Sequence, residues 1–150
     1  MSLLARKLVA DAVVVRNASD RTDLLDPKLT NTALIALLID VVAAAKSLGK
    51  WVLLTSVRTD HGFDGYLGPH SHQNGFAVDG WLLNVKQDGD YVDPTDPVFA
   101  DWLNRVLGSP WCFSIGLAGS ANTPANRAAV APLGFRDEGA DHVHLAAQIE

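Results

Sequence analysis

The chain has 150 residues, 48% of them hydrophobic and 19% charged, which suits a single domain (1–150) with one substantial core and excludes a disordered chain. Its single cysteine excludes an intramolecular disulfide framework and a multi-cysteine zinc site. The formal net charge of −5 argues against nucleic acid as a partner, because backbone binding depends on clusters of Lys and Arg. The longest apolar run, 33–45, is too short to span a bilayer.

Helix starts are marked by a capping side chain directly before a proline, a residue that is well tolerated at the first helical position. The three pairs are Asp26-Pro27, Asp96-Pro97 and Thr123-Pro124. With the apolar spacing that follows each pair, they predict helices over 27–48, 97–107 and 124–130. We also expect an earlier helix over 3–14.

Strands are predicted where β-branched and aromatic residues gather or alternate. These segments are 51–57, 75–83, 111–117 and a final pair at Phe135 and 142–146. Helices and strands mix without a regular βαβ rhythm, so we predict an α+β fold with a mainly antiparallel sheet.

All five histidines fall in two short windows. One window holds His61, His70 and His72, and the other holds His142 and His144. Alternate residues of a strand point to the same face, so the second pair would project together from a terminal strand. His61 is expected to be a loop residue, and His70 is an alternative ligand to His72.

A metal site follows from the spacing in the two windows. Asp79 lies seven positions after His72, and a turn at Gly75 would bring both side chains to one point. Two imidazoles and a carboxylate form a normal ligand set for a catalytic zinc ion. We therefore predict that His72, Asp79 and His144 bind one Zn²⁺ per chain.

Three further side chains have predicted roles around that ion. Glu138 is the candidate general base, which would take a proton from zinc-activated water and deliver it to a leaving amine. Asp141 is an alternative candidate for that base. His142 would orient the water or stabilise the oxyanion. Arg58, which follows a predicted strand, would bind a substrate carboxylate.

Two motifs resemble the zinc-site signature of the D-alanyl-D-alanine carboxypeptidase and L-alanyl-D-glutamate endopeptidase superfamily, to which the hedgehog signalling domain is similar at the site. They are Ser71-His72-x-x-Gly75-x-Ala77-x-Asp79 and Glu138-x-x-x-His142-x-His144. A predicted helix from Asp26-Pro27 and a strand leading to Arg58 also fit, so that the resemblance spans about 26–146.

The resemblance implies zinc binding by His72, Asp79 and His144, a base at Glu138 and an accessory histidine at His142. It also implies substrate binding by Arg58. The implied fold is hedgehog-like or DD-peptidase-like, with helices packed on one side of a small sheet. The implied substrate is a peptidoglycan stem peptide, hydrolysed by a zinc metallopeptidase of the carboxypeptidase or endolysin type. The chain departs from many members at Leu145, where an aromatic residue is common.

Two other functions remain open on the sequence. One is a non-catalytic structural or adhesive module that keeps the metal site, and the other is a non-haem iron enzyme, since that site also uses two histidines and a carboxylate. No signal peptide is recognised, so we expect cytoplasmic synthesis, with release to the cell wall or association with a virion for a phage enzyme. The pattern does not indicate an oligomeric state.

Overall fold

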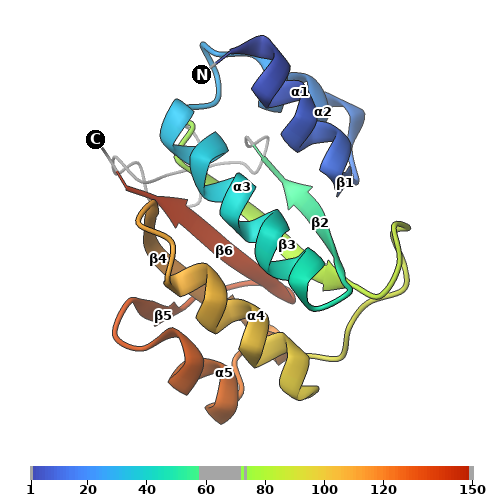
Figure 1. Ribbon diagram of the computed structural model, residues 1–150. Helices are drawn as coiled ribbons and strands as arrows, with labels where there is room; N and C mark the ends of the chain where they lie inside the picture. Colours follow the sequence, from blue (N-terminus) through green and yellow to red (C-terminus); the bar gives the residue numbers. More distant parts are fainter. Residues whose placement is uncertain (1, 58–71, 73, 149–150) are drawn as a thin grey trace.

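The computed structural model describes residues 2–57, 72 and 74–148 (Figure 1). Within these residues, five α-helices and a 3₁₀ turn surround a sheet of six strands. The helices are α1 (Leu3–Ala12), α2 (Ala18–Leu25), α3 (Thr32–Ser47), α4 (Pro97–Leu107) and α5 (Pro124–Val130), with the 3₁₀ turn η1 at Gly119–Ala121. The strands are β1 (Val13–Val15), β2 (Trp51–Ser56), β3 (Ala77–Leu83), β4 (Cys112–Ala118), β5 (Gly134–Arg136) and β6 (His142–Ala147).

The fold is α+β as predicted, but the sheet is mixed and not mainly antiparallel. Its strand order is β1-β2-β3-β6-β4-β5, and the outer pairs β1–β2 and β4–β5 are parallel. Helices connect the strands of each parallel pair: α2 and α3 lie between β1 and β2 in the chain, and α5 lies between β4 and β5. A helical crossover returns the chain to the same end of the sheet, which makes the next strand parallel. The three inner pairings are antiparallel.

The helix predicted over 27–48 begins later than its Asp-Pro signal. Asp26 and Pro27 lie in a turn, where the Asp26 side chain accepts a hydrogen bond from the Lys28 N–H at 2.8 Å. The cap of α3 is Asn31, whose side chain accepts from the Ala33 N–H at 2.9 Å. An Asp-Pro pair also suits a turn, and here the later cap determines where the helix starts. The helices predicted over 97–107 and 124–130 are confirmed as α4 and α5.

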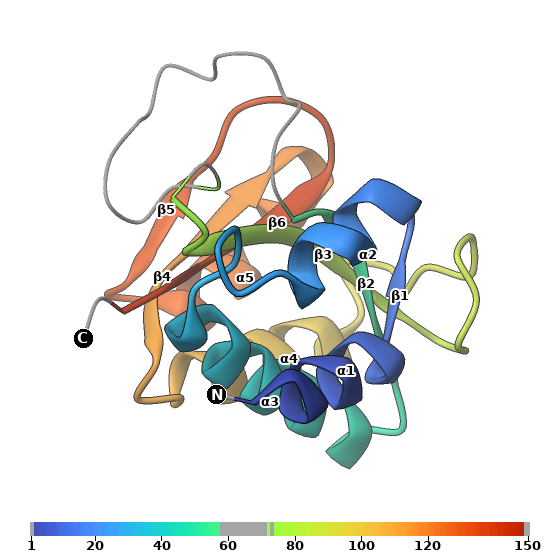
Figure 2. The same cartoon turned by 90° about the horizontal axis from the view of Figure 1, so that it is seen from above.

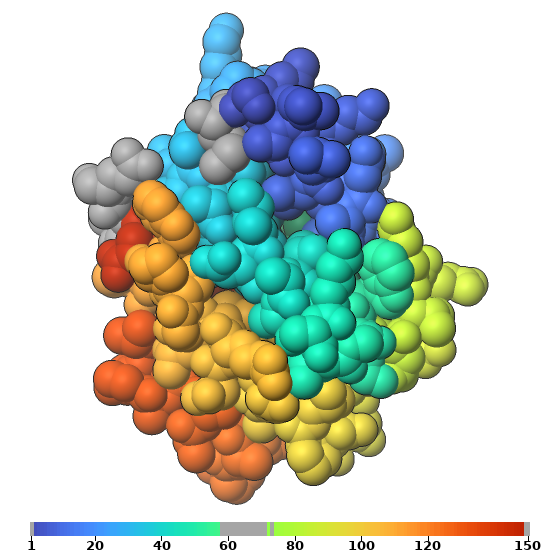
Figure 3. Space-filling view, viewed as in Figure 1, coloured from blue at the N-terminus to red at the C-terminus, as the bar shows by residue number. Residues whose placement is uncertain are grey.

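Three helices cover one face of the sheet. Figure 2 shows α1, α3 and α4 on the same side of the strands, and Figure 3 shows α3 and α4 lying side by side across that side. Phe99 and Trp102 of α4 are fully buried, with ring centroids 5.6 Å apart, and the Trp102 indole N–H donates to the Val41 carbonyl of α3. This packing leaves the opposite face of β3 and β6 available for polar side chains.

None of the helices in the described ranges has the length and apolar character needed to cross a bilayer.

Candidate metal centre

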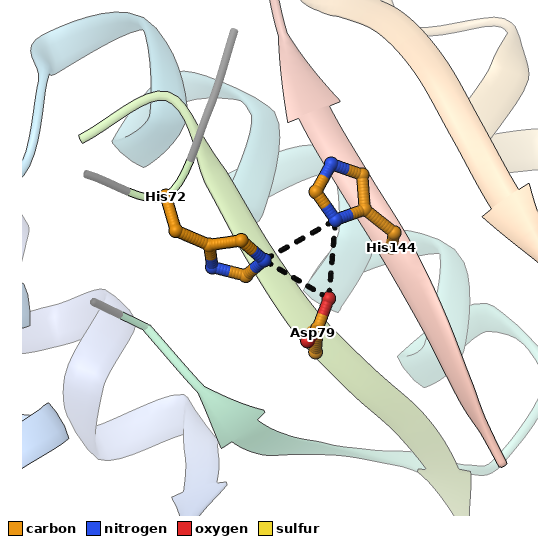
Figure 4. A group of neighbouring side chains, drawn as sticks. All are labelled: His72, Asp79 and His144. Atoms are coloured by element: carbon orange, nitrogen blue, oxygen red, sulfur yellow. Dashed lines mark hydrogen bonds and ion pairs between the residues drawn. The ribbon is translucent and has the colours of Figure 1, made fainter. Parts of the chain in front are cut away.

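The side chains of His72, Asp79 and His144 meet on the face of the sheet away from α3 and α4 (Figure 4). His72 lies in the turn before β3, Asp79 lies in β3 and His144 lies in β6. Asp79 and His144 are direct partners in the antiparallel register of the two strands. Cross-strand partners hold their Cβ atoms about 5 Å apart, so the backbone pairing alone brings these two ligand candidates together.

A glycine turn brings His72 to the same point. The Gly75 N–H donates to the His72 carbonyl at 2.9 Å, and the Gly75 carbonyl accepts from the Asn31 N–H at 2.9 Å. Gly75 has a φ of 75°, and a Cβ there would overlap the carbonyl oxygen of Leu29. Only glycine fits both conditions, which explains its place between His72 and Asp79.

The three polar atoms form a nearly equilateral triangle. The His72 Nε2 lies 3.1 Å from the Asp79 Oδ1 and 3.2 Å from the His144 Nδ1, and the third side, from His144 Nδ1 to Asp79 Oδ1, measures 3.2 Å. Tetrahedral zinc with bonds of 2.0–2.1 Å separates its ligand atoms by about 3.4 Å. The triangle is therefore within a few tenths of an ångström of the spacing that such an ion requires.

A backbone contact orients His72 for metal binding. Its Nδ1 lies 3.2 Å from the Val57 carbonyl oxygen, and this contact turns Nε2 toward the Asp79 Oδ1 and the His144 Nδ1. The Val57 N–H in turn donates to the Oδ1 of Asp20, a buried residue of α2, at 3.2 Å. Histidines that bind metals are commonly held by such a hydrogen bond on the second nitrogen.

A carboxylate–imidazole pair lies beside the triangle. The Asp137 Oδ2 is 2.6 Å from the His142 Nε2 and 3.9 Å from the His144 Nδ1, and the His142 Nε2 is 3.8 Å from the Asp79 Oδ1. The other ring nitrogen of His142, Nδ1, lies 2.8 Å from the Ala140 carbonyl oxygen. Both ring nitrogens face acceptors, an arrangement that favours the charged imidazolium.

The pKa values of this pair agree with that protonation state. Burial by itself would lower the pKa of His142, but the hydrogen bond to Asp137 and the charge of Asp79 outweigh it and raise the pKa to about 9. Burial would raise the pKa of Asp137, but the His142 hydrogen bond and the nearby charges of His142 and His144 lower it. Asp137, Asp79 and His142 also form a second set of side chains close enough to share a cation.

The structure places the predicted base, Glu138, at the surface. Its side chain is exposed, and its backbone N–H donates to the Asp137 Oδ1 at 2.8 Å. Asp141 is also exposed, and its Oδ1 accepts a hydrogen bond from the Ser120 N–H at 2.8 Å. Asp137, whose Oδ2 lies 3.9 Å from the His144 Nδ1, is therefore a further carboxylate beside the triangle, and its place there was not predicted from the sequence.

An aromatic ring contacts the last histidine from a neighbouring strand. Phe135 of β5 lies edge-on to His144, with ring centroids 5.8 Å apart. Gly116 of β4 lies between them, opposite both residues in the sheet, and a Cβ there would come within 2.6 Å of the Phe135 ring. The Phe135 ring thus reaches across Gly116 and supports His144.

The predicted substrate arginine, Arg58, lies outside the described residues, as do His61 and His70. Their predicted roles remain predictions.

Comparison with known proteins adds no relative. No family model matches the chain, and a search of curated proteins finds no match. The arrangement of His72, Asp79 and His144, with the Asp137–His142 pair beside it, therefore carries the functional argument.

Proposed function

We propose that the protein is a zinc-dependent hydrolase that cleaves an amide bond in peptidoglycan stem peptides. The observation that carries the proposal is the triangle of His72 Nε2, Asp79 Oδ1 and His144 Nδ1, with sides of 3.1–3.2 Å. Three protein ligands leave the fourth position of a tetrahedral zinc ion for water, as in catalytic sites, whereas structural sites use four protein ligands and need no acid–base pair beside them.

The donor set favours zinc over harder cations. Mg²⁺ and Ca²⁺ prefer oxygen ligands, whereas two of the three atoms here are imidazole nitrogens. Zinc in such a site polarises a carbonyl and lowers the pKa of a bound water to about 7. Non-haem iron accepts the same donors, and the experiment below separates the two metals by content and by dependence on oxygen.

Two neighbouring carboxylates are candidates for the proton transfer. The sequence motif favours Glu138, whereas the geometry favours Asp137, whose Oδ2 lies 3.9 Å from the ligating nitrogen of His144. We propose that one of them accepts the proton of the nucleophilic water and passes it to the leaving amine. We further propose that His142, whose Nε2 lies 3.8 Å from the Asp79 Oδ1, stabilises negative charge on the substrate oxygen.

The peptidoglycan substrate is proposed from the resemblance of the two motifs to cell-wall peptidases. The resemblance supports a hedgehog-like or DD-peptidase-like arrangement of the sheet, and it supports Arg58 as the group that binds a substrate carboxylate. The site of action would then be the bacterial cell wall, reached by a phage lysin, a virion-associated enzyme or a bacterial peptidase.

The test combines metal analysis with turnover of defined muropeptides followed by mass spectrometry. Zinc-loaded wild-type protein should release a peptide fragment without oxygen consumption, and His72→Ala and His144→Ala should lose both zinc and turnover. Asp137→Asn and Glu138→Gln should keep zinc, and the variant that loses turnover identifies the base. Asp101→Asn, an exposed residue of α4, is the matched control and should behave as wild type.

Zinc binding without release of any fragment would overturn the hydrolase and favour the structural or adhesive module. Iron in place of zinc, with turnover that requires oxygen, would favour the oxygenase. Normal turnover in both Asp137→Asn and Glu138→Gln would overturn the proposed proton transfer even if zinc is bound.

A further inference from the structure

A pocket of about 420 Å³ is lined in part by residues of β3 and of the segment that leads into β6, the two strands that hold Asp79 and His144. Trp81 and Leu53 form its apolar part, and Thr55, Asp93 and Asp141 belong to its polar part. Trp81 is 7% exposed and packs against Phe99 of α4, so that this wall is rigid. The Trp81 indole N–H already donates to the Val92 carbonyl at 3.0 Å, which leaves the ring as an apolar surface.

The pocket and the triangle share two segments of chain. Trp81 follows Asp79 by two residues in β3, a rise of about 7 Å along the strand. Asp141 immediately precedes His142, the first residue of β6. An extended peptide advances at most about 3.6 Å per residue, so a substrate with its cleaved bond at the triangle would place a residue one or two positions away in this pocket.

The charges that line the pocket favour a cation. Arg16, the one cation among the lining residues that the structure describes, is already paired, since its Nε and Nη2 donate to the two carboxylate oxygens of Asp88 at 2.8 and 3.1 Å. The Arg16 Nη2 also donates to the Tyr91 hydroxyl at 2.9 Å. Asp93 and Asp141 remain as two negative groups without a basic partner among the described lining residues.

Both carboxylates are held in place by neutral hydrogen-bond donors, and the charge of His142 also acts on Asp141. The Asp93 Oδ1 accepts from the N–H and the hydroxyl of Thr95 at 2.9 and 2.7 Å, and the Asp141 Oδ1 accepts from the Ser120 N–H at 2.8 Å. These hydrogen bonds lower the pKa of each carboxyl, which keeps both charged at neutral pH. Two fixed carboxylates beside an indole form a suitable environment for an ammonium group.

We propose that this pocket is a substrate subsite for an amine-bearing residue, with a side chain such as that of lysine, one or two positions from the cleaved amide. The inference rests on the proposed function and adds a substrate preference to it. The aliphatic part of such a residue would lie against Trp81 and Leu53, and its ammonium group would lie between Asp93 and Asp141.

The experiment has a cleavage arm and a binding arm, both on zinc-loaded protein. The cleavage arm compares kcat/KM for a stem pentapeptide with lysine at its third position and for the same peptide with Nε-acetyl-lysine. The binding arm follows the Trp81 indole signal by ¹H–¹⁵N NMR during titration with Nα-acetyl-lysine methylamide and with its Nε-acetylated twin. We expect the free amine to be favoured about tenfold in both arms.

The double variant Asp93→Asn/Asp141→Asn removes both charges but keeps the oxygens that accept from Thr95 and Ser120. Its zinc content and melting temperature should match those of the Asp101→Asn control, while the preference for the free amine should fall to near unity. A preference that persists in the double variant would overturn the assignment of these two carboxylates.

The two proposals fail in different ways. Equal cleavage of both peptides, with no selective change at Trp81, would overturn the subsite and leave the hydrolase intact. Selective binding of the amine at Trp81 without cleavage of any stem peptide would support the pocket's chemistry and overturn the hydrolase.

Discussion

The substitution Asp79→Asn tests the metal centre most directly, because it keeps the shape of a buried side chain while weakening one of three ligands. Asp79 is 7% exposed, and its Oδ1 lies 3.1 and 3.2 Å from the two histidine nitrogens. An amide oxygen carries no full charge and is a poorer zinc ligand than a carboxylate. Changes beside a zinc site already cost 10–100-fold in affinity, so a change in a ligand should cost at least about 100-fold.

That loss converts into a thermal shift. Zinc at about 100 times the wild-type Kd stabilises the folded state by about 2.7 kcal/mol, which raises the melting temperature of a domain of this size by roughly 5–11 °C. At the same zinc concentration a variant with 100-fold weaker binding gains about 0.4 kcal/mol, or roughly 1 °C.

The assay compares each protein with itself, with and without zinc, so that any effect of the substitution on the metal-free fold cancels. Asp101→Asn is the matched control and should shift as wild type does. Mg²⁺ should produce no shift, because its preference is for oxygen ligands. Equal zinc shifts in wild type and Asp79→Asn, or no shift in wild type, would refute the site.

Three further predictions concern the fold. Gly49 and Gly75 have positive φ values of 71° and 75°, but only at Gly75 would a Cβ meet backbone atoms. Urea unfolding should therefore show a loss of stability of about 1–2 kcal/mol for Gly49→Ala and a larger loss for Gly75→Ala, and Gly75→Ala should also weaken zinc binding. Equal losses of stability would contradict the steric argument. Burial raises the pKa of the Cys112 thiol to about 11, so iodoacetamide should alkylate the native protein far more slowly than the urea-unfolded protein at about pH 8. The hydrogen bond from Arg16 lowers the pKa of Asp88 in the folded state. The pair therefore stabilises the fold fully at pH values above the unfolded carboxyl pKa of about 3.9, and this stabilisation is lost as the pH falls through the lower pKa of the folded state. Both side chains are partly exposed, so the unfolding free energy of Asp88→Asn should lie at most about 1 kcal/mol below wild type at neutral pH, and the gap should close from about pH 5 to about pH 2.

The helices were predictable where local signals agreed. For α4 and α5 the capping residue, the proline and the apolar spacing all indicate the same start, and both helices have the predicted bounds. At Asp26-Pro27 the signal was ambiguous, because the same pair suits a turn and Asn31 provides a second cap five residues later. Sequence alone does not rank two competing caps, since tertiary contacts such as that between Asn31 and Gly75 decide between them.

The parallel strand pairs were missed for a different reason. β1 and β5 have three residues each, and although a strand was predicted at Phe135 in β5, so short a segment carries no signal of which strand it pairs with or in which direction. The residues Val13 and Val14 were absorbed into the predicted helix over 3–14. Short edge strands obtain their pairing from neighbours far away in sequence, and this is the information that a local pattern lacks.

At the metal centre, the three ligand candidates were predictable because strand alternation and a glycine turn act locally. The place of Asp137 beside the site was not predictable, because Asp137 and Glu138 are adjacent carboxylates. Which of the two faces the site depends on the path of residues 139–141 into β6. Asp20 was also missed, since it acts through the backbone of Val57, 37 positions further along the chain. Its only sequence signal is its spacing from Asn17, which resembles a helix cap.

The position of β6 has a consequence for biosynthesis. This strand follows all the others in the chain, yet it lies between β3 and β4 and contributes His144. A nascent chain on the ribosome therefore holds two separate groups of strands with unpaired edges, and it brings His144 to His72 and Asp79 only after β6 has emerged and joined them. Proteolytic removal of this one strand would break up the His72, Asp79 and His144 cluster and split the sheet in the same event.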